Sequence, residues 1–236
     1  MLLSIYVIRV LTLYKGQQRV YLWDLDPIIK QKSVVDPMIK IKVKAQDTEE
    51  SVEQIKNVLG GAIEEQWGQH QLKVSNDKAK GTIRFITFDW GVSLLELDIT
   101  FFDEVLIEVD TSDFNPISFY YCLEGYCGHK FGYQPEEKIK IMEQFQSVIL
   151  TNRDGGITDR YFPKDVKISQ TVIQVRRKPF LRKRLNQGEE LNKKLYEVFL
   201  DTDHEKVFAY YGSYNLKMAE VVTAIRKVKT KAQMYL

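Results

Sequence analysis

The sequence predicts an α+β protein in which an antiparallel β-barrel or sandwich is followed by helices. Two patterns of apolar residues support this prediction. From about Leu72 to Val175, apolar and polar residues alternate in roughly eight short runs spaced about 8 to 12 residues apart, which is typical of an antiparallel barrel or sandwich. After Lys178-Pro179 the spacing of the apolar residues becomes helical.

The predicted strands are separated by segments rich in Asp, Asn, Gly and Pro, as hairpins require. In the run from Val92 to Phe102, apolar side chains alternate with Glu96 and Asp98, so we expect these two carboxylates on a solvent-exposed face. The other runs cover residues 81–90, 105–110, 117–123, 128–133, 145–150, 157–162 and 166–175.

The segment before the barrel divides into two parts. The first contains two Asp-Pro breaks and little amphipathic order, so we expect an arm there. The second begins at Met38 with a strand of alternating apolar and basic residues and continues into a short helix that Asp47 or Thr48 can cap. The predicted division of the chain is an arm at 1–37, a strand and short helix at 38–71, the barrel at 72–176 and a helical segment at 177–236.

The C-terminal segment is predicted to form two or three helices that pair with a second copy of the chain. One stripe contains Leu191, Leu195, Val198 and Phe199. A later helix begins near Asn215, and because no Gly or Pro ends it before Leu236, we expect it to lead toward a missing effector half. Its apolar residues cover more than one stripe, so one can pack on the barrel and another on a partner helix. The residues expected at this homodimer contact are Met218, Val221, Val222, Ile225 and Val228.

The composition is that of an ordinary globular protein, with 44% hydrophobic and 28% charged residues. The 34 basic and 32 acidic residues are nearly balanced and give no overall case for a nucleic-acid or membrane partner. The apolar opening at 1–14 contains Arg9 and is shorter than the ~20 residues of a membrane span, so we expect no membrane contact and a cytoplasmic location. Cys122 and Cys127 are expected to be reduced thiols, with a hairpin disulfide as the alternative.

No pattern in the sequence predicts an enzyme or a cofactor. The three histidines, His70, His129 and His204, are isolated, and a metal-binding barrel needs two of them close together with a carboxylate. Nucleophile motifs and phosphate-binding glycine loops are absent from the sequence. The basic run from Arg176 to Arg184 reads as a solvated connector anchored by Phe180 and Leu181, with a phosphate-contacting patch as the alternative.

Aromatic residues of the predicted strands either form the core or line a ligand pocket. A barrel of this size can hold one small ligand inside. Tyr121 and His129, which carry polar groups on their rings, and the aromatic Trp90 are the candidate ligand-binding residues.

Several segments resemble the regulatory domain of AraC-family transcriptional regulators. Residues 116–125 (PISFYYCLEG), followed by His129-Lys-Phe131, resemble a strand and the turn with its Leu-Glu-Gly sequence. Residues 146–150, 161–163 and 172–180 are similar to later barrel strands, and 208–219 is similar to the loop and helix start that follow. The match runs from about Met38 to Leu236, and its order is more specific than any single motif.

The resemblance implies a cupin-like jelly-roll barrel that senses a small-molecule effector or a partner, followed by helices that dimerise. In the family a C-terminal domain with two helix-turn-helix units reads DNA, and no segment here has that pattern, so we expect no DNA binding by this chain alone. Two alternatives remain open: a metalloenzyme of the cupin superfamily, and a stand-alone binding protein that acts as an anti-regulator. The effector, the target promoter and the choice between truncation and stand-alone module are not set by the sequence.

Overall fold

The computed structural model describes residues 38–184 and 193–228 of the chain. These residues form thirteen strands and four α-helices, with one 3-10 helix, η2 (Glu136–Lys138). The predicted arm at 1–37, Leu191 and the chain beyond Val228 lie outside the described residues.

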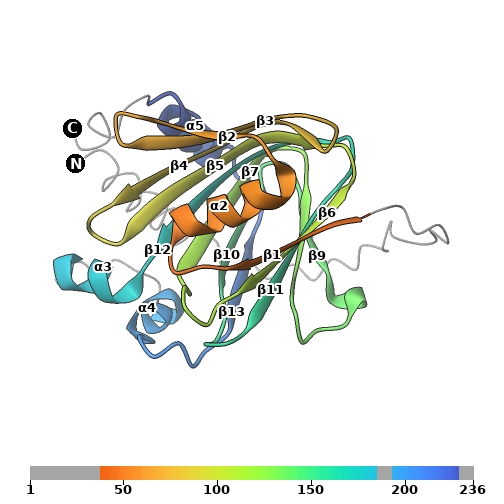
Figure 1. Ribbon diagram of the computed structural model, residues 1–236. Helices are drawn as coiled ribbons and strands as arrows, with labels where there is room; N and C mark the ends of the chain where they lie inside the picture. Colours follow the sequence, from red (N-terminus) through yellow and green to blue (C-terminus); the bar gives the residue numbers. More distant parts are fainter. Residues whose placement is uncertain (1–37, 185–192, 229–236) are drawn as a thin grey trace.

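The strands form two sheets that share one apolar core (Figure 1). The smaller sheet contains, in order, β1 (Met38–Lys44), β6 (Glu104–Asp110), β11 (Ile157–Phe162), β8 (Cys127–Phe131) and β9 (Lys140–Met142). The larger contains β13 (Phe208–Gly212), β10 (Ser147–Thr151), β7 (Ile117–Glu124), β12 (Lys167–Val175), β5 (Val92–Phe101), β4 (Ala79–Phe88), β3 (Gln69–Ser75) and β2 (Ala62–Gln66).

The pairing is antiparallel throughout both sheets except between β1 and β6, which run parallel from Met38↔Glu104 to Lys44↔Asp110. The prediction of a mostly antiparallel β domain is therefore confirmed. The strand order is that of two open sheets, each with its own edge strands, which corresponds to the sandwich of the two architectures that the sequence predicted.

The expected N-terminal strand and short helix are both present. Helix α2 (Thr48–Leu59) begins after Asp47, whose Oδ1 accepts a hydrogen bond of 2.9 Å from the Glu50 amide. Gly60 follows with a φ of 77°, a value that favours glycine after the last helical turn. Val52, Ile55 and Leu59 bury the apolar face of α2 in the core shared by the two sheets.

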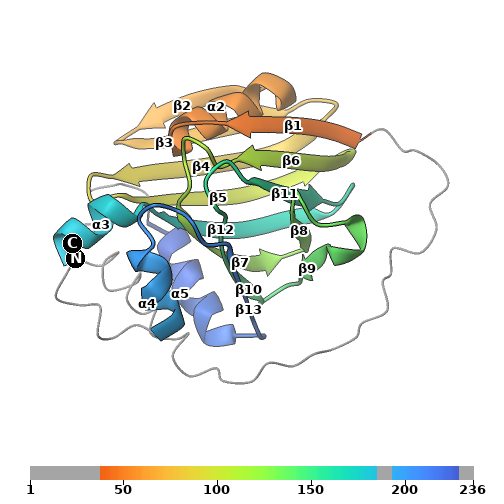
Figure 2. The same cartoon turned by 90° about the horizontal axis from the view of Figure 1, so that it is seen from below.

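The other helices cover the outer face of the larger sheet. Figure 2 shows α3 (Arg177–Arg184), α4 (Lys193–Leu200) and α5 (Leu216–Arg226) together on one side of that sheet, and α2 on the opposite side of the molecule beside β1. A second apolar cluster lies beneath α3, α4 and α5 and includes Phe180, Val198 and Phe199. None of the described helices is long and apolar enough to cross a membrane.

Helix α5 starts where the sequence predicted. Its N-cap is Asn215, whose Oδ1 accepts a hydrogen bond of 3.1 Å from the Met218 amide. The helix ends at Arg226, within the described residues.

Two segments differ from their predictions. The basic run, expected to be a solvated connector, forms α3, and its Arg177 is only 1% exposed. Residues 208–212, expected in a loop, form β13, which pairs with β10 at the edge of the larger sheet. The expectation for the cysteines is confirmed, because Cys122 and Cys127 are both buried and free.

Candidate ligand cavity

A small cavity lies between the two sheets, at the end where β8, β9 and β11 face β7, β10 and β13. Its volume is about 10 Å³, roughly the space of one water molecule. It is lined by Tyr120, Cys127, His129, Lys140, Met142, Val148, Leu150, Arg160 and Tyr211.

Arg160 is the most unusual residue of this cavity, because its guanidinium is buried among uncharged groups. One terminal nitrogen donates to Cys127 Sγ and to Gln170 Oε1, each at 3.2 Å, and the guanidinium carbon lies 3.9 Å from the centroid of the Tyr120 ring. Within residues 38–184 and 193–228, no carboxylate forms an ion pair with Arg160, and its Nε has no hydrogen-bond partner. A guanidinium remains charged at neutral pH, so the cavity carries a positive charge.

His129 lies directly opposite Arg160 in the pairing of β8 with β11. Its Nδ1 is 2.9 Å from the Tyr211 hydroxyl, while its Nε2 has no hydrogen-bond partner among the described residues. Burial, and then the charge of Arg160, lowers the pKa of His129 to about 3, so the ring is neutral at pH 7. When the Tyr211 hydroxyl donates to Nδ1, Nε2 carries the proton and is free to donate.

The three residues predicted to bind a ligand are not brought together. Only His129 lines the cavity. Tyr121 and Trp90 belong to the cluster on the other face of the larger sheet, beneath the helices. The Tyr121 hydroxyl donates to the carbonyl of Asn215 at 2.7 Å, and burial raises the pKa of this tyrosine. The Trp90 ring packs 6.2 Å from that of Phe180.

The residues predicted at a dimer contact all pack against the chain's own larger sheet. Met218, Val222 and Ile225 are at most 2% exposed, and Val221 and Val228 are partly buried against the same cluster. The second apolar stripe predicted for α5 is therefore partly buried against this cluster. The homodimer itself stays a prediction.

Tyr120 belongs to the aromatic strand segment that was predicted to form core or line a pocket, whereas Arg160 and Tyr211 were not predicted as cavity residues. For Arg160 a signal exists in the alternation of β11, where Thr158, Arg160 and Phe162 share one face. A basic residue in register with Phe162, which lies in the core, is a candidate for a buried site.

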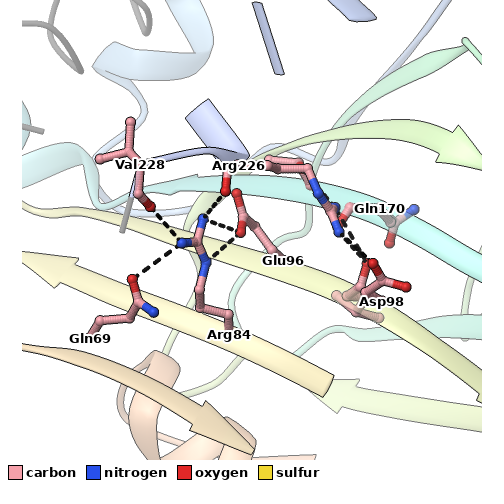
Figure 3. A network of polar contacts seen from close by, with 9 residues as sticks. Gln69, Arg84, Glu96, Asp98, Gln170, Arg226 and Val228 are labelled. Atoms are coloured by element: carbon pink, nitrogen blue, oxygen red, sulfur yellow. Dashed lines mark hydrogen bonds and ion pairs between the residues drawn. The ribbon is translucent and has the colours of Figure 1, made fainter. Parts of the chain in front are cut away.

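The sequence predicted Glu96 on a solvent-exposed face, and this prediction is wrong because the side chain is buried. It is 5% exposed and forms an ion pair with Arg84, whose Nε is 2.5 Å from Glu96 Oε2 (Figure 3). Burial raises the pKa of Glu96, and the charge of Arg84 opposes that rise. The outer face of β5 is covered by the end of α5, where Arg226 forms an ion pair of 3.4 Å with Asp98.

Gln170 connects the cavity to the end of α5. Its side chain accepts from Arg160 and donates to Cys127 Sγ at 3.3 Å on the core side of β12. Its backbone carbonyl accepts a bond of 3.4 Å from the Arg226 guanidinium on the helix-covered side (Figure 3). One residue of the larger sheet thus contacts both the buried charge and the last residue of the helix.

Within the described ranges, no three His, Cys, Asp or Glu residues are grouped as metal ligands would be. His70 stacks on Phe85 at 4.9 Å, and His204 contacts Arg177 beside α4. The three histidines thus have three different environments.

No protein-family model and no curated protein matches the chain. Among solved structures it resembles YhhW from Escherichia coli (8% identity, 66% of this chain and 54% of that chain, TM-score 0.28). It also resembles Ylba from E. coli (10% identity, 51% of this chain and 51% of that chain, TM-score 0.30). A third similar structure is oxalate decarboxylase from Bacillus subtilis (6% identity, 72% of this chain and 46% of that chain, TM-score 0.33). These are cupin-fold proteins, and the chain spans about half of their length. Likeness at this level assigns no function to the chain.

The low pKa of His129 predicts a specific dependence of stability on pH. Between the unfolded pKa of about 6.5 and the folded value of about 3, the unfolded chain binds a proton that the folded chain does not, so stability falls as the pH falls. We expect the free energy of unfolding to decrease by about 2 kcal/mol more in the wild type than in His129→Gln between pH 7 and pH 5. Urea unfolding at each pH measures this difference, and parallel curves for the two proteins would contradict the assignment.

Proposed function

We propose that this chain is the sensing and dimerisation part of an AraC-type transcriptional regulator. In this proposal the two sheets form a cupin-like jelly roll, the cavity between them receives a small-molecule effector, and α5 carries the signal toward a DNA-reading domain. The chain alone acts in the cytoplasm, binds no DNA and catalyses no reaction.

The observation that carries this proposal is the double contact of Gln170. A ligand that contacts Arg160 changes the partner of the Gln170 side chain, and the carbonyl of the same residue holds Arg226 at the end of α5. Arg84 adds a second connection from the sheet, because it donates to the carbonyl of Val228 at 2.7 Å. The sheet therefore holds the C-terminal end of α5 by polar bonds whose geometry a change at the cavity can shift.

Hydrogen exchange of Gln170→Leu tests this connection. We expect the amides of α5 to exchange roughly tenfold faster than in the wild type, which corresponds to about 1.4 kcal/mol of local stability, while those of α2 stay unchanged. The matched control is Gln144→Leu, because Gln144 is exposed and bonds only the carbonyl of Leu123 among the described residues. Equal changes in α2 and α5, or none in α5, would overturn the proposed path.

The homodimer is a separate part of the proposal. Because Met218, Val222 and Ile225 already pack on the sheet, the contact between two copies would use other surfaces of the C-terminal segment. Sedimentation equilibrium of the full chain over a range of concentrations tests it. A single monomeric species at the highest concentration would remove dimerisation from the proposed function.

A further inference from the structure

The cavity combines a buried positive charge with hydrogen-bond donors that have no acceptor. Arg160 is 6% exposed and His129 is 4% exposed, so water at the protein surface does not solvate them. Burying a cation without a nearby anion is unfavourable, and a protein usually offsets this with a carboxylate. The described residues supply no carboxylate to Arg160, and the Nε atom of Arg160 and the Nε2 atom of His129 are both unpaired there.

These donors face one shared space. Arg160 and His129 are cross-strand partners, a relation that places side chains about 5 Å apart on one face of a sheet, and both line the cavity. The Tyr211 hydroxyl fixes His129 through Nδ1, and Lys140 adds a second basic residue to the lining. No acidic residue lines the cavity.

The size of the cavity limits the ligand. With space for about one water molecule, it can admit a single atom or a very small ion without rearrangement of the core. Arginine pairs well with anions, and a neutral histidine with a free N–H adds a donor without a second buried charge.

We propose that this cavity binds a small monovalent anion between the Arg160 guanidinium and His129 Nε2: a halide in the space present, or formate or nitrate after a shift of the lining side chains. The inference rests on the proposed function in that it names the class of effector for the sensing site. Cys127 and Gln170 both accept from one terminal nitrogen of the guanidinium, and Cys127 itself lines the cavity.

Thermal unfolding in sodium bromide, sodium nitrate and sodium formate tests the proposal, with sodium gluconate keeping the ionic strength constant. A ligand of the folded state raises the Tm in a saturable way, by roughly 3–6 °C at ten times its Kd for a chain of this size. We expect at least one of the three anions to do this with the wild type and none with Arg160→Met. Arg182→Met, the same substitution at an exposed arginine of α3 outside the cavity, should keep the effect.

Crystals of the full chain soaked in sodium bromide provide a measurement that does not depend on how well Arg160→Met folds. An anomalous bromide peak between Arg160 and His129 supports a halide site. If bromide appears only beside surface lysines and formate and nitrate also leave the Tm unchanged, the proposal is wrong.

The two proposals can fail separately. If no anion binds but Gln170→Leu still speeds exchange in α5, the effector belongs to another class and the sensing path stands. If an anion binds but exchange in α5 does not respond to Gln170→Leu, the anion site stands and the signalling role fails.

Discussion

Arg84→Leu is expected to lower the free energy of unfolding by about 3–5 kcal/mol at pH 8. The substitution leaves Glu96, 5% exposed, without its ion-pair partner. It also removes the hydrogen bonds from Arg84 to Gln69 Oε1 at 3.2 Å and to the carbonyl of Val228. A buried carboxylate that has lost its partner destabilises the fold by more than the intact ion pair had stabilised it.

The size of this loss should depend on pH in a defined direction. The pKa of Glu96 is already raised by burial, and the loss of Arg84 removes a charge that lowers it, so in the variant the pKa rises further. Between the unfolded pKa and this higher folded pKa the folded chain binds the extra proton, so stability falls as the pH rises. Arg84→Leu should therefore be less destabilising at pH 5 than at pH 8.

A double-mutant cycle separates the pair from its surroundings. Arg84→Leu with Glu96→Leu should be more stable than Arg84→Leu alone, because no buried charge is left unpaired. The surface pair of Lys73 and Glu64, with side chains 51% and 60% exposed, is the control, and Lys73→Ala should cost at most about 1 kcal/mol. Urea unfolding measures the wild type, Arg84→Leu, Glu96→Leu, the double variant and Lys73→Ala. If the losses of the two single variants simply add in the double variant, the pair is not coupled.

The position of Glu96 explains a general difference between the prediction and the fold. Alternation along β5 correctly placed Leu95, Leu97 and Ile99 on one face and Glu96 on the other. The error was to equate the polar face with water, because α5 and its Arg226 cover that face. A period of two shows that two faces differ, but it does not show what packs on either of them.

Elements fixed by local patterns were predicted well. The strand at Met38, the helix capped by Asp47 and the helix start at Asn215 each depend on residues that are close in sequence. The parallel pairing of β1 with β6 and the addition of β13 to β10 join segments about sixty residues apart, and no local signal specifies them.

The candidate site was harder to predict than the fold. His129 was selected for its polar ring, but Tyr121 and Trp90 were selected without knowledge of which face of the sheet they occupy. Arg160 was not among the predicted site residues, and a basic residue in a strand is usually exposed. The cavity depends on the pairing of β8 with β11, and this pairing places Arg160 beside His129.

Arg177→Leu is the second substitution with a large expected effect, a loss of about 3–4 kcal/mol in the free energy of unfolding. Arg177 donates to the carbonyls of Val198 and Asn115, each at 2.9 Å, and to Thr151 Oγ1 at 2.7 Å. These acceptors belong to α4, to the segment before β7 and to β10, so one side chain joins three parts of the chain. Leucine would leave the acceptors unpaired in a buried region, at about 1–3 kcal/mol for each that water cannot reach.

The loss is smaller than the sum of these bonds, because leucine also removes a buried charge. Burial lowers the pKa of Arg177 to about 10, which indicates that its desolvation is costly. Arg182→Leu in the same helix is the matched control, and because Arg182 is exposed it should change stability by no more than about 0.5 kcal/mol.

A second measurement distinguishes the lost bonds from a general loss of packing. The pKa of His204 is lowered by burial and then by the charge of Arg177, whose guanidinium lies 2.5 Å from His204 Nδ1. Arg177→Leu should therefore raise the pKa of His204, followed by the NMR shift of its ring protons, while Arg182→Leu leaves it unchanged. If Arg177→Leu unfolds at the same urea concentration as the wild type and the His204 titration does not move, Arg177 does not hold α4 to the sheet.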